Sequence, residues 1–282
     1  MPELPEVETI KNQLKSKILG QRIIKVEVKL AKMIQGVPVD FFKTKIKQAT
    51  VISVSRRAKI LIIGLFNGYS LLIHLKICGQ LIYLDNLNQL ENFLKKYTHL
   101  IYYFSNGGCL LHNDIRQFGY VKLVKTGDLE KIFSRENYGP EPLDKKFTQE
   151  KFIALFKINP SAVGQKIKPL LMDQAFLSGL GNIYAQEACW CAKILPTRRV
   201  ETLSEKEMKL LYFCLTSILK AAIKARGTSV ADYLDAEGKQ GDFGQQLKIY
   251  GCEKRPCSRC GQKIKKIILA GRGTSYCPYC QK

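Results

Sequence analysis

Two pairs of cysteines near the C-terminus constrain this chain more than any other feature of its sequence. Cys257 and Cys260 form one C-x2-C pair, and Cys277 and Cys280 form a second pair after sixteen intervening residues. Each pair presents two sulfurs on one side of a tight turn, and two such turns complete the tetrahedral thiolate site that Zn²⁺ prefers. The stretch IKKIIL between the pairs is typical of a strand. We therefore predict one structural zinc per chain, clamping a two-stranded hairpin that is too small to fold without the metal.

The remaining cysteines match no metal-binding pattern. Cys252 lies just outside the two pairs, and five others lie in apolar stretches, where a thiol packs as a small hydrophobic group: Cys78, Cys109, Cys189, Cys191 and Cys214. The acidic start MPELPE lacks the basic and apolar segments of a signal peptide. We therefore expect a cytoplasmic protein whose cysteines are thiols rather than a disulfide framework. The sequence has no run of 18 apolar residues, so we expect no membrane span.

The charge of the chain indicates an acidic partner. The 282 residues include 45 Lys and Arg against 24 Asp and Glu, a formal net charge of +21. Disorder does not explain this excess, because 46% of the residues are hydrophobic. A basic chain of this kind favours nucleic acid as the partner, with a merely soluble basic protein as the alternative. The length predicts about two domains.

The hydrophobic pattern divides the chain into blocks. Residues 1–125 read as a short helix followed by β-structure, with strands expected at 23–28, 60–63, 69–73 and 100–104. A polar stretch at 126–148 contains GPEP and is typical of a linker. Residues 149–245 show helical spacing, with the first helix expected to end at Pro160, and 246–282 form the cysteine tail. These blocks predict an α+β multidomain fold.

The N-terminus offers a nucleophile. If methionine is removed, Pro2 becomes a secondary amine that can attack an aldehyde carbon, and Glu3 beside it is a candidate general acid and base. Pro5 suits the first turn of a helix, and Val7, Ile10, Leu14 and Ile18 follow on one face, so we expect a helix here. The positive field at its N-terminus disfavours the protonated amine. Taken alone, however, a proline at position 2 is a processing signal.

Ordered motifs along the whole chain identify a family. They are MPELPEVET at 1–9, RRAK at 56–59, HLKICG at 74–79, NDIRQFG at 113–119, GPEPL at 139–143, GLGNIY at 179–184 and GRGTSYC at 271–277. Together with the cysteine tail, they closely resemble the bacterial formamidopyrimidine-DNA glycosylases, which remove 8-oxoguanine from DNA. The resemblance implies an N-terminal β-sandwich, a helix–two-turn–helix domain and a zinc finger, acting as a monomer on damaged duplex DNA in the bacterial nucleoid.

The resemblance also implies a mechanism. The Pro2 amine attacks C1′ of the damaged nucleotide, the base leaves, and β,δ-elimination follows from the Schiff base. Glu3 is then the proton donor and acceptor, and Lys59 and Arg272 join the catalytic set through phosphate contacts. Without the resemblance, Lys59 would read as a solvated lysine in a strand.

The same resemblance assigns contacts with DNA. It implies phosphate binding by His74, Asn182 and Tyr250. Ile77, Arg116 and Phe118 would fill the space left by a flipped base. Ile77 departs from the usual methionine, Gln117 from a usual basic residue and Gln186 from a usual aspartate. The loop GTSV at 227–230 matches the loop that covers the lesion in the family.

Two alternatives stay open from the residues. One is the related endonuclease VIII, which prefers oxidised pyrimidines, although Leu4 stands where that relative usually has glycine. The other is a zinc-ribbon DNA-binding protein without catalysis, which requires Pro2 to be blocked or idle.

Overall fold

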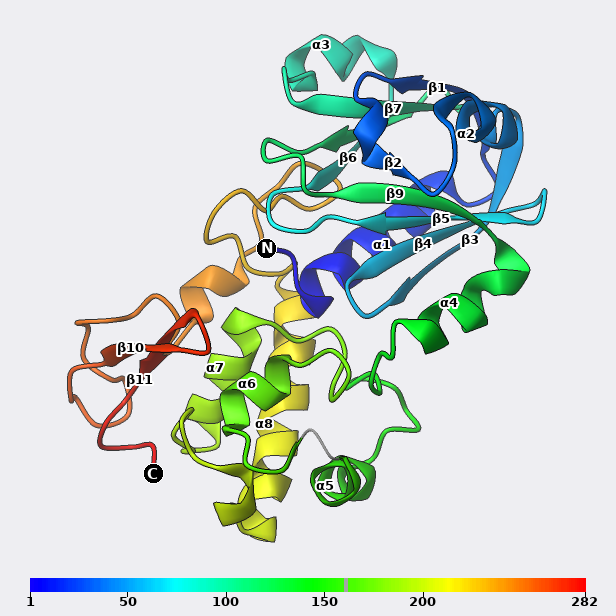
Figure 1. The fold of residues 1–282 in the computed structure, drawn as a ribbon. Coiled ribbons are helices and arrows are strands. Elements are labelled where there is room, and N and C mark those ends of the chain that lie inside the picture. The colour runs from blue at the N-terminus through cyan, green and yellow to red at the C-terminus, as the bar shows by residue number, and fades with distance from the viewer. Residues whose placement is uncertain (160–161) are drawn as a thin grey trace. The chain divides into compact units, whose positions relative to one another are not determined.

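The computed structural model describes residues 1–159 and 162–282, which form two compact units. The first unit combines residues 1–135 with 225–244, and the second combines 136–224 with 245–282. Residues 225–244, which lie inside the predicted block 149–245, pack with the β-rich first unit. Figure 1 shows the elements of both units.

The first unit begins with helix α1 (Leu4–Ile18). Pro5 lies in its first turn, and the predicted apolar face is confirmed, since Val7, Ile10, Leu14 and Ile18 are all buried. Gly20, with φ +79°, follows the end of the helix. The apolar face of α1 belongs to the same hydrophobic core as the strands, so this core holds the N-terminus in place.

The strands of the first unit follow one another by hydrogen bonding in the order β2-β9-β5-β4-β3-β1-β7-β8-β6. Their bounds are β1 Arg22–Val28, β2 Ile34–Gln35, β3 Ala49–Arg57, β4 Ile60–Leu65, β5 Tyr69–His74, β6 Gln80–Leu84, β7 Thr98–Phe104, β8 Cys109–Asn113 and β9 Tyr120–Lys125. The start of β1 pairs with β3 and the rest pairs with β7, so β1 joins two halves. One core draws residues from both halves, as expected for the predicted sandwich.

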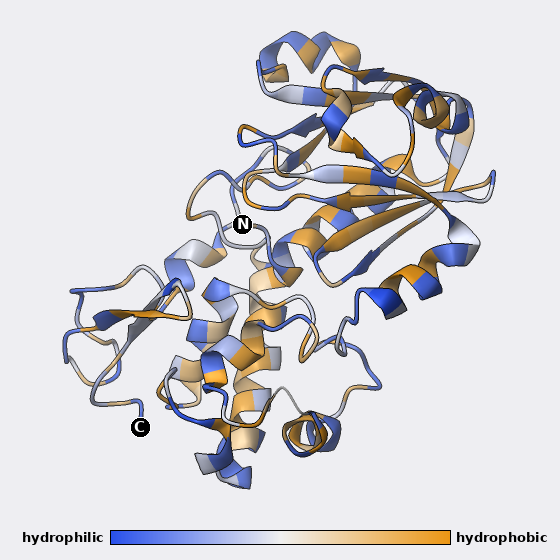
Figure 2. Ribbon diagram, in the orientation of Figure 1, coloured by the Kyte–Doolittle hydropathy of each residue, from blue (hydrophilic) through white to orange (hydrophobic). Residues whose placement is uncertain are grey.

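The apolar runs of the sequence correspond to these strands. Every residue of β4 is buried, and Figure 2 shows apolar residues along β4 and β5. The four predicted strands at 23–28, 60–63, 69–73 and 100–104 are thus confirmed as β1, β4, β5 and β7. Short helices complete the unit: α2 (Val39–Ile46), α3 (Leu90–Phe93) and α4 (Leu129–Arg135). Helix α4 lies inside the stretch that we expected to be only a linker.

The second unit contains the helices α5 (Gln149–Ile158), α6 (Ile167–Met172), α7 (Asn182–Cys191) and α8 (Glu205–Lys224). Thr148 caps α5, because its side chain accepts a hydrogen bond from the Lys151 N–H. The predicted helix stop at Pro160 lies outside the described residues. Among the described residues, no helix is long and apolar enough to cross a membrane.

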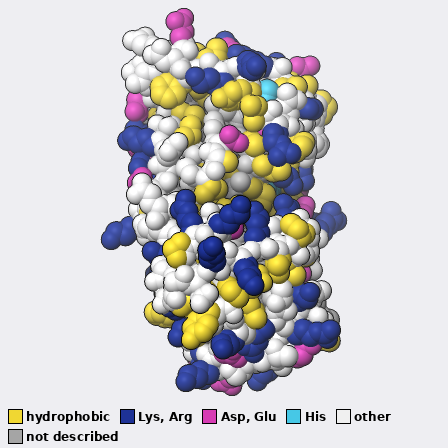
Figure 3. Space-filling model, turned by 90° about the vertical axis from the view of Figure 1, so that its left-hand side faces the viewer, with side chains coloured by type: hydrophobic (Ala, Val, Ile, Leu, Met, Phe, Trp, Pro, Cys, Tyr) yellow, Lys and Arg dark blue, Asp and Glu magenta, His cyan; other side chains and the backbone are white. Residues whose placement is uncertain are grey.

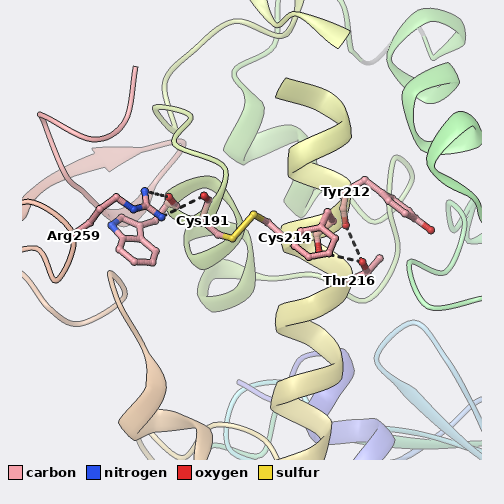
Figure 4. Close-up of a disulfide and its surroundings, with 7 residues drawn as sticks. Cys191, Tyr212, Cys214, Thr216 and Arg259 are labelled. Atoms are coloured by element: carbon pink, nitrogen blue, oxygen red, sulfur yellow. Dashed lines mark hydrogen bonds between the residues drawn. A yellow bond between two sulfur atoms is a disulfide. The ribbon is translucent and has the colours of Figure 1, made fainter. Parts of the chain in front are cut away.

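The cysteines correct one expectation. Cys191 and Cys214 form a disulfide between the last residue of α7 and the middle of α8, rather than packing as separate thiols (Figure 4). Their Cα atoms are 5.8 Å apart, within the range that a disulfide can span. Cys78, Cys109 and Cys189 are buried thiols, as expected. Helical packing, which the linear spacing does not reveal, brings the two bonded residues together.

The C-terminal tail forms the predicted hairpin. Strand β10 (Lys265–Leu269) pairs antiparallel with β11 (Arg272–Tyr276). Leu269 faces Arg272, and the two residues between them, Ala270 and Gly271, have φ values of +47° and +71°. Two consecutive positive φ values are typical of a type I′ turn, which matches the twist of a hairpin. Arg272 therefore follows directly after the turn.

Candidate catalytic and nucleic-acid-binding site

The N-terminus of α1 holds two glutamates in a reciprocal cap. The Glu3 side chain accepts from a backbone N–H of the first turn, and Glu6 Oε2 accepts from the Glu3 N–H at 2.8 Å. Both carboxylates are buried, with 2% and 1% exposed. Pro2 is also buried, whereas Met1 is 44% exposed and makes the Pro2 nitrogen an amide. Removal of Met1 would leave a secondary amine next to the Glu3 carboxylate.

Lys59 lies in the tight turn between β3 and β4, not in a strand, and is only 8% exposed. The preceding Ala58 has φ +52°. Arg56 ties this turn to α1: its Nη1 donates to the Ala58 carbonyl at 2.7 Å, and its Nε donates to Glu8 Oε2 at 2.9 Å. Burial raises the pKa of Glu8, but the hydrogen bonds from Lys11 and Arg56 outweigh it and hold that pKa below its usual value. The turn of Lys59 and the helix of Glu3 are therefore fixed to each other.

His74 pairs with Ile60, the residue after Lys59, across β5 and β4. Burial, followed by the positive charges of Lys76 and Lys59, lowers the pKa of His74 to about 3. The ring is therefore neutral at physiological pH. Its Nδ1 accepts a hydrogen bond from the Lys76 N–H at 2.9 Å, so the proton of the neutral imidazole is on Nε2. That N–H can donate to a phosphate oxygen without adding charge.

Two loops carry the residues predicted to enter the base stack. Ile77 follows the end of β5, and Phe118 precedes the start of β9. Because His74 pairs with Tyr120, both loops adjoin the same end of this strand pair. Ile77 is 36% exposed and Phe118 is 53% exposed, although both are large and apolar. The Arg116 guanidinium lies over the Phe118 ring, 4.9 Å from its centre. A wedge and a hydrogen-bond donor are therefore available on one loop.

Asp114 holds this loop in shape, a role that our sequence reasoning missed. Its buried carboxylate accepts from the Arg116 N–H at 3.1 Å and from the Gly119 N–H at 2.6 Å. A Cβ on Gly119 would lie 2.9 Å from that carboxylate and 3.1 Å from the His74 carbonyl, so only glycine fits here. The motif NDIRQFG contained this signal, because an aspartate five residues before a glycine can close such a loop.

The segment 225–244 is anchored to one face of α1. Glu6 Oε1 accepts from the Thr228 N–H at 2.8 Å, while the other oxygen of the same carboxylate caps Glu3. Two turns further along α1, Gln13 accepts from the Ala236 N–H at 2.8 Å and donates to the buried Asp235. The loop that matches the lesion-covering loop is thus joined to the catalytic N-terminus through Glu6.

In the second unit, α7 and the zinc hairpin are joined by two amide side chains. Asn182, the first residue of α7, donates to the Gly273 carbonyl at 3.3 Å. Gln186 donates to the Asn182 carbonyl at 2.7 Å and accepts from the Ser275 N–H at 2.6 Å. An amide at position 186 can do both, whereas a carboxylate could only accept. The departure at Gln186 therefore has a structural role. The N-terminus of α7 offers backbone N–H groups suited to a phosphate.

Tyr250 is positioned by Glu187, which the sequence did not single out. The Glu187 carboxylate accepts from the N–H groups of Lys248, Ile249 and Tyr250 at 2.9–3.1 Å and is only 3% exposed. Burial raises the pKa of Glu187, and the three backbone donors oppose that rise. One buried side chain thus fixes the backbone that carries Tyr250.

Arg272 is exposed at the start of β11, and among the described residues no ion pair holds it. Beneath this strand lies Lys168, a fully buried lysine of α6 whose Nζ donates to Thr274 Oγ1 at 2.7 Å. No local pattern in the sequence distinguishes Lys168 from the surface lysines. It joins α6 to the strand that presents Arg272.

The four predicted zinc ligands meet at one point. The sulfur atoms of Cys257, Cys260, Cys277 and Cys280 lie within 4.8 Å of one another, and no other cluster of this kind is found in the described part of the chain. A tetrahedron with Zn–S bonds of about 2.3 Å has edges of about 3.8 Å, so the four thiolates fit Zn²⁺. The sulfur of Cys252 contacts two backbone carbonyls instead, which agrees with its exclusion from the site.

The structure places the predicted site residues in two groups. The first unit holds Pro2, Glu3, Lys59, His74, Ile77, Arg116 and Phe118, and the second holds Asn182, Tyr250, Arg272 and the four zinc cysteines. Figure 3 shows many more basic than acidic side chains on the face that it displays. Each group supplies donors and cations of the kind that bind phosphates.

Family models match three consecutive parts of the chain. Residues 1–121 match the formamidopyrimidine-DNA glycosylase N-terminal domain, 138–233 match the formamidopyrimidine-DNA glycosylase H2TH domain, and 255–282 match the zinc finger found in FPG and IleRS. A formamidopyrimidine-DNA glycosylase of Pelotomaculum thermopropionicum is 42% identical, covering 100% of this chain and 99% of its own length. One of Heliobacterium modesticaldum is 40% identical, covering 100% of both chains.

Solved structures agree with these matches. A Lactococcus lactis FPG mutant in complex with a Fapy-dG containing DNA has a TM-score of 0.90 and 36% identity, covering 100% of both chains. The Lactococcus lactis Fpg in complex with an abasic site containing DNA also has a TM-score of 0.90, at 36% identity and 99% coverage of each chain.

Proposed function

This chain belongs to the formamidopyrimidine-DNA glycosylase family, and from that premise we propose that Pro2, freed from Met1, is the nucleophile of a bifunctional glycosylase and lyase. Base-excision repair of damaged DNA is the function of the chain, and it is an enzyme with glycosylase and lyase activities. The observation that carries the assignment of Pro2 is that it is buried next to Glu3, whose carboxylate caps α1.

The chemistry proceeds in ordered steps. The Pro2 nitrogen attacks C1′ of the damaged nucleotide, and the C1′–N bond to the base breaks as the new C–N bond forms. Glu3 protonates the sugar ring oxygen as the ring opens, which leaves an iminium ion at Pro2. The iminium ion makes the C2′ proton acidic, and its removal, with Glu3 as the acceptor, breaks the C3′–O bond in β-elimination. Loss of a further sugar proton then breaks the C5′–O bond in δ-elimination, so both flanking phosphates leave.

Lys59 and Arg272 support these steps as phosphate contacts. Lys59 is held in a buried turn that is fixed to α1, so its charge keeps a constant position relative to Pro2. His74 adds a neutral donor beside it. Asn182 and Tyr250 bind further phosphates through groups that α7 and Glu187 hold in place.

Zn²⁺ in the Cys257, Cys260, Cys277 and Cys280 site has a structural role, because it holds the hairpin that presents Arg272. Four thiolates leave no open position on the metal for a substrate.

Oxidised purines are the proposed substrates, with 8-oxoguanine and formamidopyrimidines first. Reaching C1′ requires the base to leave the stack, and we assign Phe118, Ile77 and Arg116 to fill the space. Their exposure on two adjacent loops supports this role. The expected setting is the cytoplasm, on nucleoid DNA, with the enzyme acting as a monomer.

A strand-cleavage assay tests the function. Duplexes carrying 8-oxoguanine, Fapy-guanine or dihydrouracil opposite their normal partners are incubated with protein whose Met1 removal has been verified by intact mass. We expect a one-nucleotide gap with phosphate at both ends, formed faster on the two purine lesions. Faster cleavage of dihydrouracil would favour the endonuclease VIII type of specificity, and binding without cleavage would favour a non-catalytic DNA-binding protein.

A further inference from the structure

A groove in the first unit lies at the opposite end of the sheet from the groups proposed for catalysis. Strands β5 and β9 pair His74 with Tyr120 at one end and Tyr69 with Lys125 at the other. Six residues of strand span roughly 17 Å. Tyr69 and Lys125 line a hollow of about 390 Å³. DNA bound near His74 therefore does not need this surface.

The groove has an apolar floor. Its lining includes the aliphatic residues Val37, Leu123 and Ile132 together with two aromatic rings. The rings belong to Phe41 of α2 and Tyr69, which meet edge to face with centres 6.2 Å apart. Phe41 is 39% exposed, although it is a large apolar residue. Burial of this floor under an apolar side chain stabilises a complex, because apolar surface is removed from water.

The rim of the groove is basic. Lys45 Nζ lies 5.4 Å from the Phe41 ring centre and 5.6 Å from that of Tyr69. Lys131 and Arg135 reach the groove from one face of α4, as their spacing of four residues requires. Neither these cations nor Lys125 takes part in an ion pair within residues 1–159 and 162–282.

Helix α4 packs weakly for a helix of a folded unit. None of its residues is buried, and Ile132, one of its three apolar residues, lines the groove. A helix of seven residues has little stability of its own in water and depends on tertiary contacts. An occupant of the groove would supply those contacts.

We propose that this groove docks an acidic segment of a partner protein that carries one large apolar side chain. The carboxylates would pair with Lys125, Lys131 and Arg135, and the apolar side chain would cover Phe41 and Tyr69. Nucleic acid fits less well, because phosphates gain nothing from the apolar floor. The inference is independent of the catalytic assignment, since none of these residues belongs to it.

Fluorescence anisotropy with the full-length protein tests the proposal. The probe is a fluorescein-labelled heptapeptide of sequence EDEFEDG, and the control peptide, EDESEDG, lacks the one large apolar side chain. We expect the probe to bind with a Kd on the order of 10 µM at low salt, and the control peptide at least about fivefold more weakly. A saturating abasic-site duplex should not displace the probe.

Groove variants locate the binding. The double variant Lys131→Glu and Arg135→Glu should weaken peptide binding about tenfold or more, and Phe41→Ala about fivefold. Lys220→Glu, an exposed lysine of α8, is the matched control and should change nothing. All variants should cleave lesion DNA at the unaltered rate. Each of three results would overturn the proposal. The first is an unchanged peptide affinity in the groove variants, and the second is no binding up to about 1 mM. The third is a parallel loss of DNA binding in the double variant.

Discussion

The two compact units prepare their contacts with DNA in different ways. In the first unit the groups proposed for chemistry are buried, and main-chain hydrogen bonds fix Glu3 and Glu6 in the cap of α1. In the second unit Arg272 is exposed on a small hairpin, whose shape depends on zinc and on the amide contacts of Gln186. The difference indicates that catalysis and the affinity for DNA can be changed separately. Substitutions in the two units should therefore change different measured quantities.

The largest expected effect is on the affinity for DNA. Cys260→Ser removes a zinc ligand, and the hairpin has little other core, since half of the surrounding hydrophobic cluster consists of the zinc cysteines themselves. Specific DNA binding should fall by about 10³-fold, towards the non-specific level. Metal analysis should find one zinc per chain in the parent protein and none in the variant. Cys252→Ser, outside the zinc cluster, should keep both zinc and binding. Active parent protein without zinc would contradict the assignment.

The next effect is on chemistry alone. Glu3→Gln removes the proton donor and acceptor but leaves the Pro2 amine, so excision of 8-oxoguanine should slow about 100-fold. Elimination at a pre-formed abasic site should suffer less, and binding to abasic-site DNA should not change. Single-turnover rates on the two substrates measure this difference. If DNA binding falls as much as the excision rate, Glu3 is mainly structural.

A smaller effect should separate base flipping from elimination. Phe118→Ala removes the exposed wedge, so excision from duplex should slow about tenfold, because the cost of unstacking the base is no longer offset. Cleavage at an abasic site has no base to flip and should be almost unaffected. Ile77→Met, which restores a flexible apolar side chain, should be neutral or slightly favourable. Equal losses on both substrates for Phe118→Ala would remove the wedge role.

The smallest effect concerns salt. Arg272→Ala should reduce the slope of log K against log salt by about one charge, because a cation on phosphate releases counterions. His74→Gln should weaken binding without changing that slope, because a ring with a pKa of about 3 carries no charge at pH 7. Titrations between about 50 and 200 mM salt measure both slopes. A reduced slope for His74→Gln would mean that the histidine is protonated in the complex.

Residues close together in the sequence allowed much of this site to be predicted. The zinc ligands follow from two local turns, and the buried face of α1 follows from helical spacing. The roles of Pro2 and Lys59 came instead from family resemblance. The burial of Lys59 in a turn was not evident from the sequence, because the run RRAK lacks the usual turn residues.

Long-range contacts could not be predicted. Glu6 reaches Thr228 across 222 positions, and Glu187 reaches Tyr250 across 63. The Cys191–Cys214 disulfide likewise depends on how α7 packs against α8. Such pairs leave no periodic trace in the sequence, because a buried carboxylate that accepts backbone hydrogen bonds can be supplied by any segment that the fold brings near.

The central claim is that residue 2 forms the covalent bond to DNA. Borohydride reduction during the reaction with an oligonucleotide containing 8-oxoguanine opposite cytosine should trap a protein–DNA adduct, and peptide mapping should place it on Pro2. A matched protein with an uncleaved N-terminal extension keeps that nitrogen as an amide, so it should bind the same DNA but neither excise nor trap. Trapping by the extended protein at the rate of the processed one would show that a lysine side chain is the nucleophile, with Lys59 the first candidate, and would contradict the account.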